Sequence, residues 1–146
     1  MQGKKRTVGI IGIGHVGAHV AYSLAVQGIA DEIILVDRER KKADCEAQDV
    51  MDSVCYLPHR VEVRSGDFPD LKDCDVLVNS AGHIQLLATG NKSRLEEMDF
   101  TIRAVNGYVD RVMESGFDGV VINVTNPCDV APTRSEERRV GKECRS

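Results

Sequence analysis

The sequence predicts an α/β protein built on a doubly wound parallel sheet with the strand order 3-2-1-4-5. Two observations predict this class. Short apolar runs alternate with longer helical patterns along the chain, and glycines stand at the ends of both. Such alternation favours parallel strands joined by right-handed crossovers. The chain of 146 residues, 42% hydrophobic and 29% charged, is long enough for one globular domain of this kind.

Five strands are predicted, from apolar runs at 7–11, 33–36, 75–79 and 119–124 and an alternating, edge-like run at 60–64. Helices are predicted over 15–26 and 39–55. A third, long helix is predicted between the last two strands, where apolar residues recur at spacings of three and four: Leu95, Met98, Ile102, Val105, Val109 and Val112. Gly28 and Gly116 stand where left-handed C-caps end helices, and Ser93 and Glu96 have the spacing of a capping box.

Composition argues against several classes of function. A net charge of -4 provides no basic stripe for nucleic acid. The five cysteines form no C-x-x-C pair, which argues against a metal site or a disulfide framework and favours free thiols in a reducing compartment. The apolar stretch 8–30 carries five glycines and two histidines, unlike a signal peptide or a membrane span. We therefore expect a cytoplasmic protein without metal, nucleic acid or membrane partners.

A G-x-G-x-x-G motif is formed by Gly12, Gly14 and Gly17. The motif alone is common, but here it follows a strand, opens a helix, and is followed 20 residues after Gly17 by Asp37 at the end of the next strand. This context predicts a dinucleotide site. The alternative interpretation is a glycine turn that only packs a helix on a sheet.

Each glycine has a distinct expected role. Gly12 permits the tight turn, Gly14 lets the backbone approach a pyrophosphate, and Gly17 lets helix and strand pack closely. The backbone N–H groups at the start of the helix, including those of His15 and Val16, are expected to face the phosphates.

Asp37 is expected to accept hydrogen bonds from the adenosine ribose. Its carboxylate would repel a 2′-phosphate, which favours NAD over NADP. Arg38 and Arg40 stand close by in the sequence and leave NADP open as the alternative.

Four ordered segments carry a resemblance to a known family: GIIGIGHVG at 9–17, DVLVNSAG at 75–82, GNKSRL at 90–95 and TNPCDV at 125–130. Together they resemble the L-lactate/malate dehydrogenases, in particular the L-2-hydroxyisocaproate dehydrogenases, over roughly residues 6–130. The resemblance implies a Rossmann-type domain and hydride transfer between NAD and C2 of a small 2-hydroxy or 2-oxo acid. It also implies that full-length members are homo-oligomers.

The resemblance implies substrate contacts at three positions. Arg94 would be the loop arginine that polarises the reacting carbonyl. Asn126 would hydrogen-bond the substrate and orient the catalytic histidine. Gln85 occupies the specificity position, where malate enzymes carry an arginine, so a neutral residue there favours an apolar substrate side chain.

Further residues would contact the cofactor. Ser80, Ala81 and Gly82 are expected to line its cleft through their backbones. Val124 and Asn126 are expected beside the cofactor at the carboxyl end of the fifth strand, where such sheets bind ligands.

The resemblance places the catalytic histidine, its aspartate partner and the carboxylate-binding arginine in a second half that this sequence does not include. His15 and His83 do not match that histidine. We therefore expect an incomplete NAD-binding domain over residues 1–132, ending before the sixth strand and the substrate domain, and inactive by itself. Residues 133–146 form a polar, unpatterned tail that we interpret as a translated sequencing adapter; a natural charged tail is the alternative.

Two other functions stay open. One is a non-catalytic NAD-binding regulatory module, which would have no use for Arg94 and Asn126. The other is a fragment of a malate dehydrogenase, against which Gln85 argues.

Overall fold

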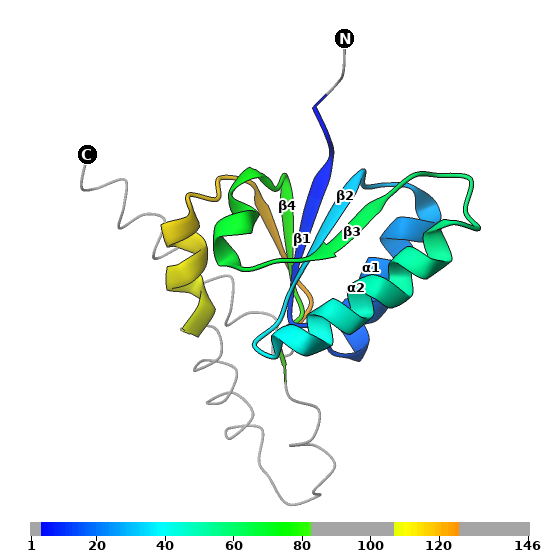
Figure 1. The fold of residues 1–146 in the computed structure, drawn as a ribbon. Coiled ribbons are helices and arrows are strands. Elements are labelled where there is room, and N and C mark those ends of the chain that lie inside the picture. Colours follow the sequence, from blue (N-terminus) through cyan, green and yellow to red (C-terminus); the bar gives the residue numbers. More distant parts are fainter. Residues whose placement is uncertain (1–3, 83–106, 126–146) are drawn as a thin grey trace, which may run out of the picture.

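The computed structural model describes residues 4–82 and 107–125. Over these residues, a parallel five-stranded sheet has the order β3-β2-β1-β4-β5, which confirms the predicted strand order (Figure 1). Its strands are β1 (Thr7–Ile11), β2 (Glu32–Val36), β3 (Glu62–Ser65), β4 (Val76–Asn79) and β5 (Val120–Asn123). The predicted third strand begins two residues too early, because pairing with β2 starts only at Glu62.

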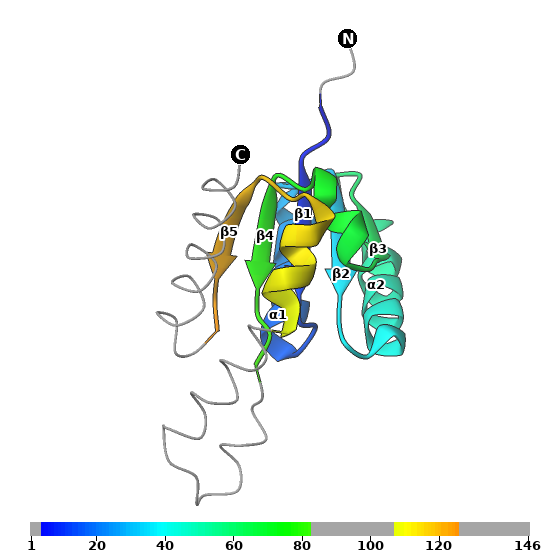
Figure 2. The same cartoon turned by 90° about the vertical axis from the view of Figure 1, so that its left-hand side faces the viewer.

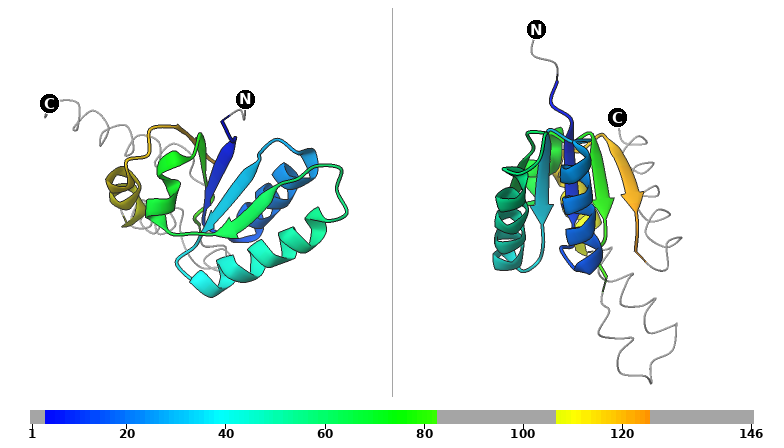
Figure 3. Two further views of the ribbon diagram at one scale, coloured as in Figure 1. Left: turned by 45° about the horizontal axis from the view of Figure 1, so that its top comes forward. Right: turned by 90° about the vertical axis from the view of Figure 1, so that its right-hand side faces the viewer.

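Helices cover both faces of the sheet (Figures 2 and 3). One face carries α1 (His15–Gln27) and α2 (Arg40–Val54), and the other carries η1 (Phe68–Asp73) and a helix over 107–115. Gly28 and Gly116 follow the first and last of these with positive φ angles of 61° and 84°, as the sequence predicts. The part of the predicted helix between β4 and β5 that precedes residue 107, including its capping box, lies outside the described residues.

The short 3₁₀ helix η1 is not predicted from the sequence, because six residues are too few to show a helical period. Asp67 and Asp70 form a capping box around its first turn. Phe68 and Leu71 are buried beneath it. In the sequence, η1 lies between β3 and β4, and it covers part of one face of the sheet.

Two apolar clusters form the core, one on each face of the sheet. The cluster under α1 and α2 includes the β1 residues Val8 and Ile10, whereas the opposite cluster includes Ile11 and the β4 residue Leu77. Small residues on α1 allow it to lie close to the sheet, namely Gly17, Ala21 and Ala25. β5 forms an edge of the sheet among the described residues, and its Val120, Val121 and Ile122 are 62%, 47% and 48% exposed.

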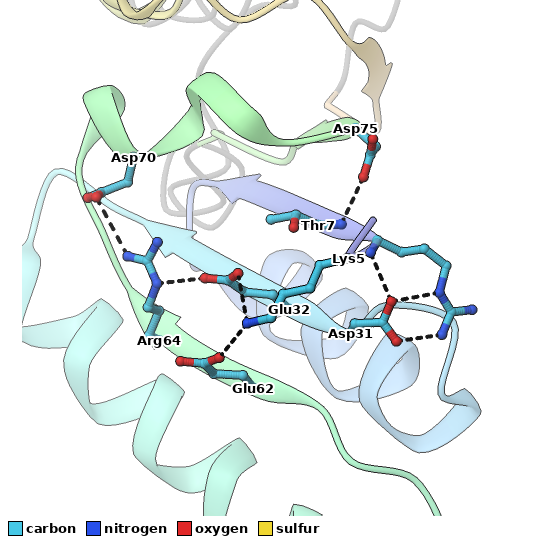
Figure 4. Close-up of polar contacts among 9 residues, drawn as sticks. Lys5, Thr7, Asp31, Glu32, Glu62, Arg64, Asp70 and Asp75 are labelled. Atoms are coloured by element: carbon cyan, nitrogen blue, oxygen red, sulfur yellow. Dashed lines mark hydrogen bonds and ion pairs between the residues drawn. The ribbon is translucent and has the colours of Figure 1, made fainter. Parts of the chain in front are cut away.

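Charged side chains gather at the amino ends of the strands (Figure 4). The Asp31 carboxylate accepts hydrogen bonds from the backbone N–H of Arg6 at 2.8 Å and from the Arg6 side chain through Nε at 3.0 Å and Nη2 at 2.8 Å. On the other side of β1, Asp75 accepts from the backbone N–H of Thr7 at 3.0 Å and pairs with Lys4. The hydrogen bonds from Arg6, those of its side chain above all, hold the pKa of Asp31 well below its ordinary value.

A second group of charges bridges the starts of β1, β2 and β3 (Figure 4). Lys5 pairs with Glu32 at 3.7 Å and with Glu62 at 3.1 Å, and Arg64 pairs with Glu32 at 2.8 Å and with Asp70 at 3.6 Å. Exposed ion pairs contribute little singly, but a shared carboxylate such as that of Glu32 links three strands.

The Asp31 contacts predict a dependence of stability on pH. A carboxylate whose pKa is lowered by folding stabilises the protein above its unfolded pKa, and this contribution is lost as the pH falls through the folded pKa. We expect the urea midpoint of the wild-type chain to fall more steeply below pH ~4 than that of Asp31→Asn. Asp49→Asn removes an exposed carboxylate that contacts no charged group among residues 4–82 and 107–125, so it is the control and should keep the wild-type slope. Equal slopes for all three proteins would contradict the assignment.

Candidate dinucleotide site

The loop after β1 is held in a conformation that requires glycine at its first position. Gly12 has φ +88°, and a Cβ on it would lie 2.6 Å from both Cα and N of Ala81. Its backbone N–H donates to the Val36 carbonyl at 2.8 Å. The turn predicted at Gly12 is therefore present, and it packs against the residues that follow β4.

The other two glycines of the motif differ in their surroundings. A Cβ on Gly17 would lie 2.2 Å from the Gly12 carbonyl oxygen and 2.7 Å from Ser80 Oγ, so Gly17 allows α1 to meet the loop. A Cβ on Gly14 would have nothing within 4 Å. Gly14 also has φ -84°, a conformation open to any residue. Neither packing nor backbone strain accounts for glycine at position 14.

The space beside Gly14 is open and lies at the amino end of α1. α1 begins directly after Gly14 with no side-chain cap and no acidic residue in its first turn. The first N–H groups of a helix lack partners within the helix and attract anions. His15 and Val16 begin this turn with exposed side chains, Val16 being 46% exposed. The structure thus places both predicted residues in the first turn of α1.

The carboxylate of Asp37, at the end of β2, turns toward the same loop. Its Oδ2 accepts from the backbone N–H of Ile13 at 2.6 Å and its Oδ1 from that of Glu39 at 2.9 Å. A carboxylate has about four acceptor positions, so both oxygens retain capacity for ribose hydroxyls. The sequence pattern predicts only the sugar contact, whereas the structure shows that Asp37 also anchors the glycine loop.

Two arginines flank this carboxylate in the sequence. Arg40 pairs with Asp44 at 3.1 Å along the exposed surface of α2. Arg38 is exposed, and no hydrogen bond or ion pair is found for it among the described residues.

The chain leaving β4 packs on the glycine loop from the other side. Ser80 donates its backbone N–H to the Ile11 carbonyl at 2.9 Å and its hydroxyl to the Gly12 carbonyl at 2.7 Å. The Ala81 N–H donates to Asn79 Oδ1 at 3.2 Å, and the following Gly82 is exposed. Of these predicted residues, Ser80 therefore holds the loop by hydrogen bonds, whereas Ala81 lies close against Gly12.

Two asparagines that the sequence analysis does not single out join the carboxyl ends of β4 and β5. Asn79 is 1% exposed, and its Nδ2 donates to Asn123 Oδ1 at 2.7 Å. The Thr125 hydroxyl donates to the same oxygen at 2.9 Å. Burial raises the pKa of Tyr108, whose hydroxyl group also bonds to Asn79. The sequence feature that could have identified this pair is an asparagine at the end of each of two apolar runs.

The predicted residue Val124 lies directly after β5. Its backbone N–H donates to the Asn79 carbonyl at 2.9 Å, and the residue is 42% exposed. The predicted substrate residues Gln85, Arg94 and Asn126 lie outside the described residues.

Other site types find no counterpart in the part of the chain that the structure describes. Over those residues, no group of three metal-ligating side chains is found, and no helix has both the length and the apolarity to cross a membrane. The described cysteines, Cys45, Cys55 and Cys74, are free. Burial raises the pKa of the Cys74 thiol to about 12, so it stays protonated at neutral pH.

Known proteins are similar to this chain in sequence and in fold. Residues 6–141 match the family described as lactate/malate dehydrogenase, NAD binding domain. An L-lactate dehydrogenase of Fusobacterium nucleatum is 42% identical over 125 residues, which are 86% of this chain and 38% of that protein. The chain thus spans well under half the length of this relative.

Solved structures give the same result. A lactate dehydrogenase from a Medee basin deep-sea metagenome library matches with a TM-score of 0.82 at 28% identity, over 92% of this chain and 43% of that one. The minor L-lactate dehydrogenase of Enterococcus mundtii, in its ligand-bound form, matches with a TM-score of 0.80 at 33% identity, over 86% and 39%. The chain therefore belongs to the NAD-binding domain family of the lactate/malate dehydrogenases, and its cofactor is NAD.

Proposed function

We propose that the chain holds NAD for an L-2-hydroxy-acid dehydrogenase, which transfers a hydride between the nicotinamide ring and C2 of a 2-hydroxy or 2-oxo acid. The observation that carries the proposal is the open space at Gly14, beside the start of α1 and the Asp37-anchored loop. The L-lactate dehydrogenases among its relatives support the reaction class.

The residues that hold NAD have separable roles in this proposal. The N–H groups at the start of α1 bind the pyrophosphate, and Asp37 accepts from the adenosine ribose while it keeps the loop in place. Ser80 and Ala81 fix the loop from the β4 side. When bound, NAD supplies the hydride acceptor.

We propose that the substrate carries an apolar side chain, lactate-like or bulkier, as in 2-hydroxyisocaproate. Gln85, flanked by Ile84 and Leu86, provides no cation for a second carboxylate, which argues against malate. Arg94 would stabilise the negative charge that develops on the carbonyl oxygen, and Asn126 would hold the substrate. These roles rest on the resemblance.

The setting of the whole enzyme is also a proposal. The cysteine pattern supports a cytoplasmic protein. The family resemblance supports a role in carboxylic acid metabolism and a homo-oligomer.

Gly14→Val tests the cofactor site. The valine meets open space and an ordinary backbone conformation, so the melting temperature should stay close to that of the wild type. Its side chain would occupy the space assigned to the pyrophosphate, and the NAD affinity measured by calorimetry should fall at least about 100-fold. Gly17→Val is the matched control, because its clash with the Gly12 carbonyl should destabilise the fold itself. A Gly14→Val protein that binds NAD as the wild type does would refute the proposed site.

Asp37→Asn tests the choice between NAD and NADP. The amide removes the charge that repels a 2′-phosphate, so the ratio of NAD to NADP affinity should fall at least about tenfold. Asp49→Asn removes an equal charge from α2 without touching the loop or either arginine, and should leave the ratio unchanged. Calorimetric titrations with both dinucleotides measure the ratio. An unchanged ratio in Asp37→Asn would remove Asp37 from the ribose site.

A chain made of these 146 residues is proposed to bind NAD without turnover, because the resemblance places the proton-transferring histidine in a second half. Incubation with NAD and L-lactate or L-2-hydroxyisocaproate should produce no NADH absorbance above a protein-free control. Steady NADH production proportional to the concentration of the pure chain would contradict this.

A further inference from the structure

A part-buried chain of hydrogen bonds runs from the end of β5 to the loop after β4. The Thr125 hydroxyl donates to Asn123 Oδ1, and Asn79 Nδ2 donates to that same oxygen. Asn79 Oδ1 in turn accepts the backbone N–H of Ala81. We call the Asn79 and Asn123 side chains, with the bond between them, the Asn79–Asn123 bridge.

Stability alone does not account for the bridge. Burying an amide is unfavourable unless its hydrogen bonds are made, and two apolar side chains of similar shape can replace a bonded pair at little cost. The β4 residues that precede Asn79, Leu77 and Val78, are buried and apolar. A strand that continued in this way would also satisfy the core.

The bridge is continuous with the glycine loop. Ala81, whose N–H the bridge binds, lies so close to Gly12 that a Cβ there would be 2.6 Å from the Ala81 Cα and N. The preceding residue, Ser80, donates its hydroxyl to the Gly12 carbonyl. A shift of Ala81 would therefore move Gly12, and with it the start of α1.

We propose that Asn79 is a positioning residue for the cofactor: through Ala81 it fixes the glycine loop in the shape that receives the pyrophosphate. The inference rests on the proposed NAD site. Asn123 and Thr125 hold the Asn79 amide in the orientation that presents Oδ1 to Ala81. The ends of β4 and β5 thereby set the geometry of a loop that follows β1.

The test separates positioning from stability with three variants. Asn79→Leu removes the donor to Asn123 Oδ1 and the partner of the Tyr108 hydroxyl, so it should be destabilised and should bind NAD about tenfold more weakly. Adding Asn123→Leu and Tyr108→Phe replaces the two polar groups that Asn79 contacted with apolar ones, and the melting temperature should return toward that of the wild type. The NAD affinity of this triple variant should stay about tenfold low, because Ala81 still lacks its acceptor.

Tyr108→Phe alone is the control, since it breaks a bond to Asn79 and leaves the Ala81 contact in place; its NAD affinity should match the wild type. Hydrogen exchange provides a readout without cofactor, in which the Ala81 amide should exchange faster in the triple variant than in Tyr108→Phe. A triple variant with wild-type NAD affinity and wild-type exchange at Ala81 would overturn the inference. A wild-type chain that binds no NAD would instead refute the proposed function, and the exchange measurement would still decide whether Asn79 holds the loop.

Discussion

The glycine loop keeps its shape because hydrogen bonds hold it from both neighbouring strands. From β2, the Val36 carbonyl accepts the Gly12 N–H and the Asp37 carboxylate accepts the Ile13 N–H. From β4, the Ser80 hydroxyl donates to the Gly12 carbonyl. A loop with little side-chain bulk has many conformations available, so these external contacts are what select one of them.

The strand order makes it possible for two neighbouring strands to hold this loop. β1 lies between β2 and β4 in the sheet, so the loop that follows it has a paired strand on each side. Parallel strands bring all their carboxyl ends to one edge, where the loop contacts gather, while the Arg6–Asp31 and Lys5–Glu32 pairs lie at the opposite edge. The contacts that join strand starts are therefore separate from those that shape the cofactor site.

Local patterns were enough to predict the strand order, the C-caps at Gly28 and Gly116, and the turn at Gly12. Each depends on residues close in sequence or on a general rule of chain crossover. The contacts of Asn79 and the second role of Asp37 could not be predicted in this way. They join residues 24 and 44 positions apart, and which side chains meet depends on the register of the strands. The roles of Gln85, Arg94 and Asn126 stay predictions, since they lie outside the described residues.

The central place of β1 also bears on how the chain is made. β1, β2 and β3 lie within the first 65 residues, but the other neighbour of β1 begins only at Val76. During synthesis from the amino terminus, the strand that is buried along its whole length thus emerges well before its second pairing partner. Until then a growing polypeptide presents an unpaired strand edge, the kind of surface that chaperones recognise and that associates with other chains. The architecture that protects this strand in the finished protein leaves it unprotected on the ribosome.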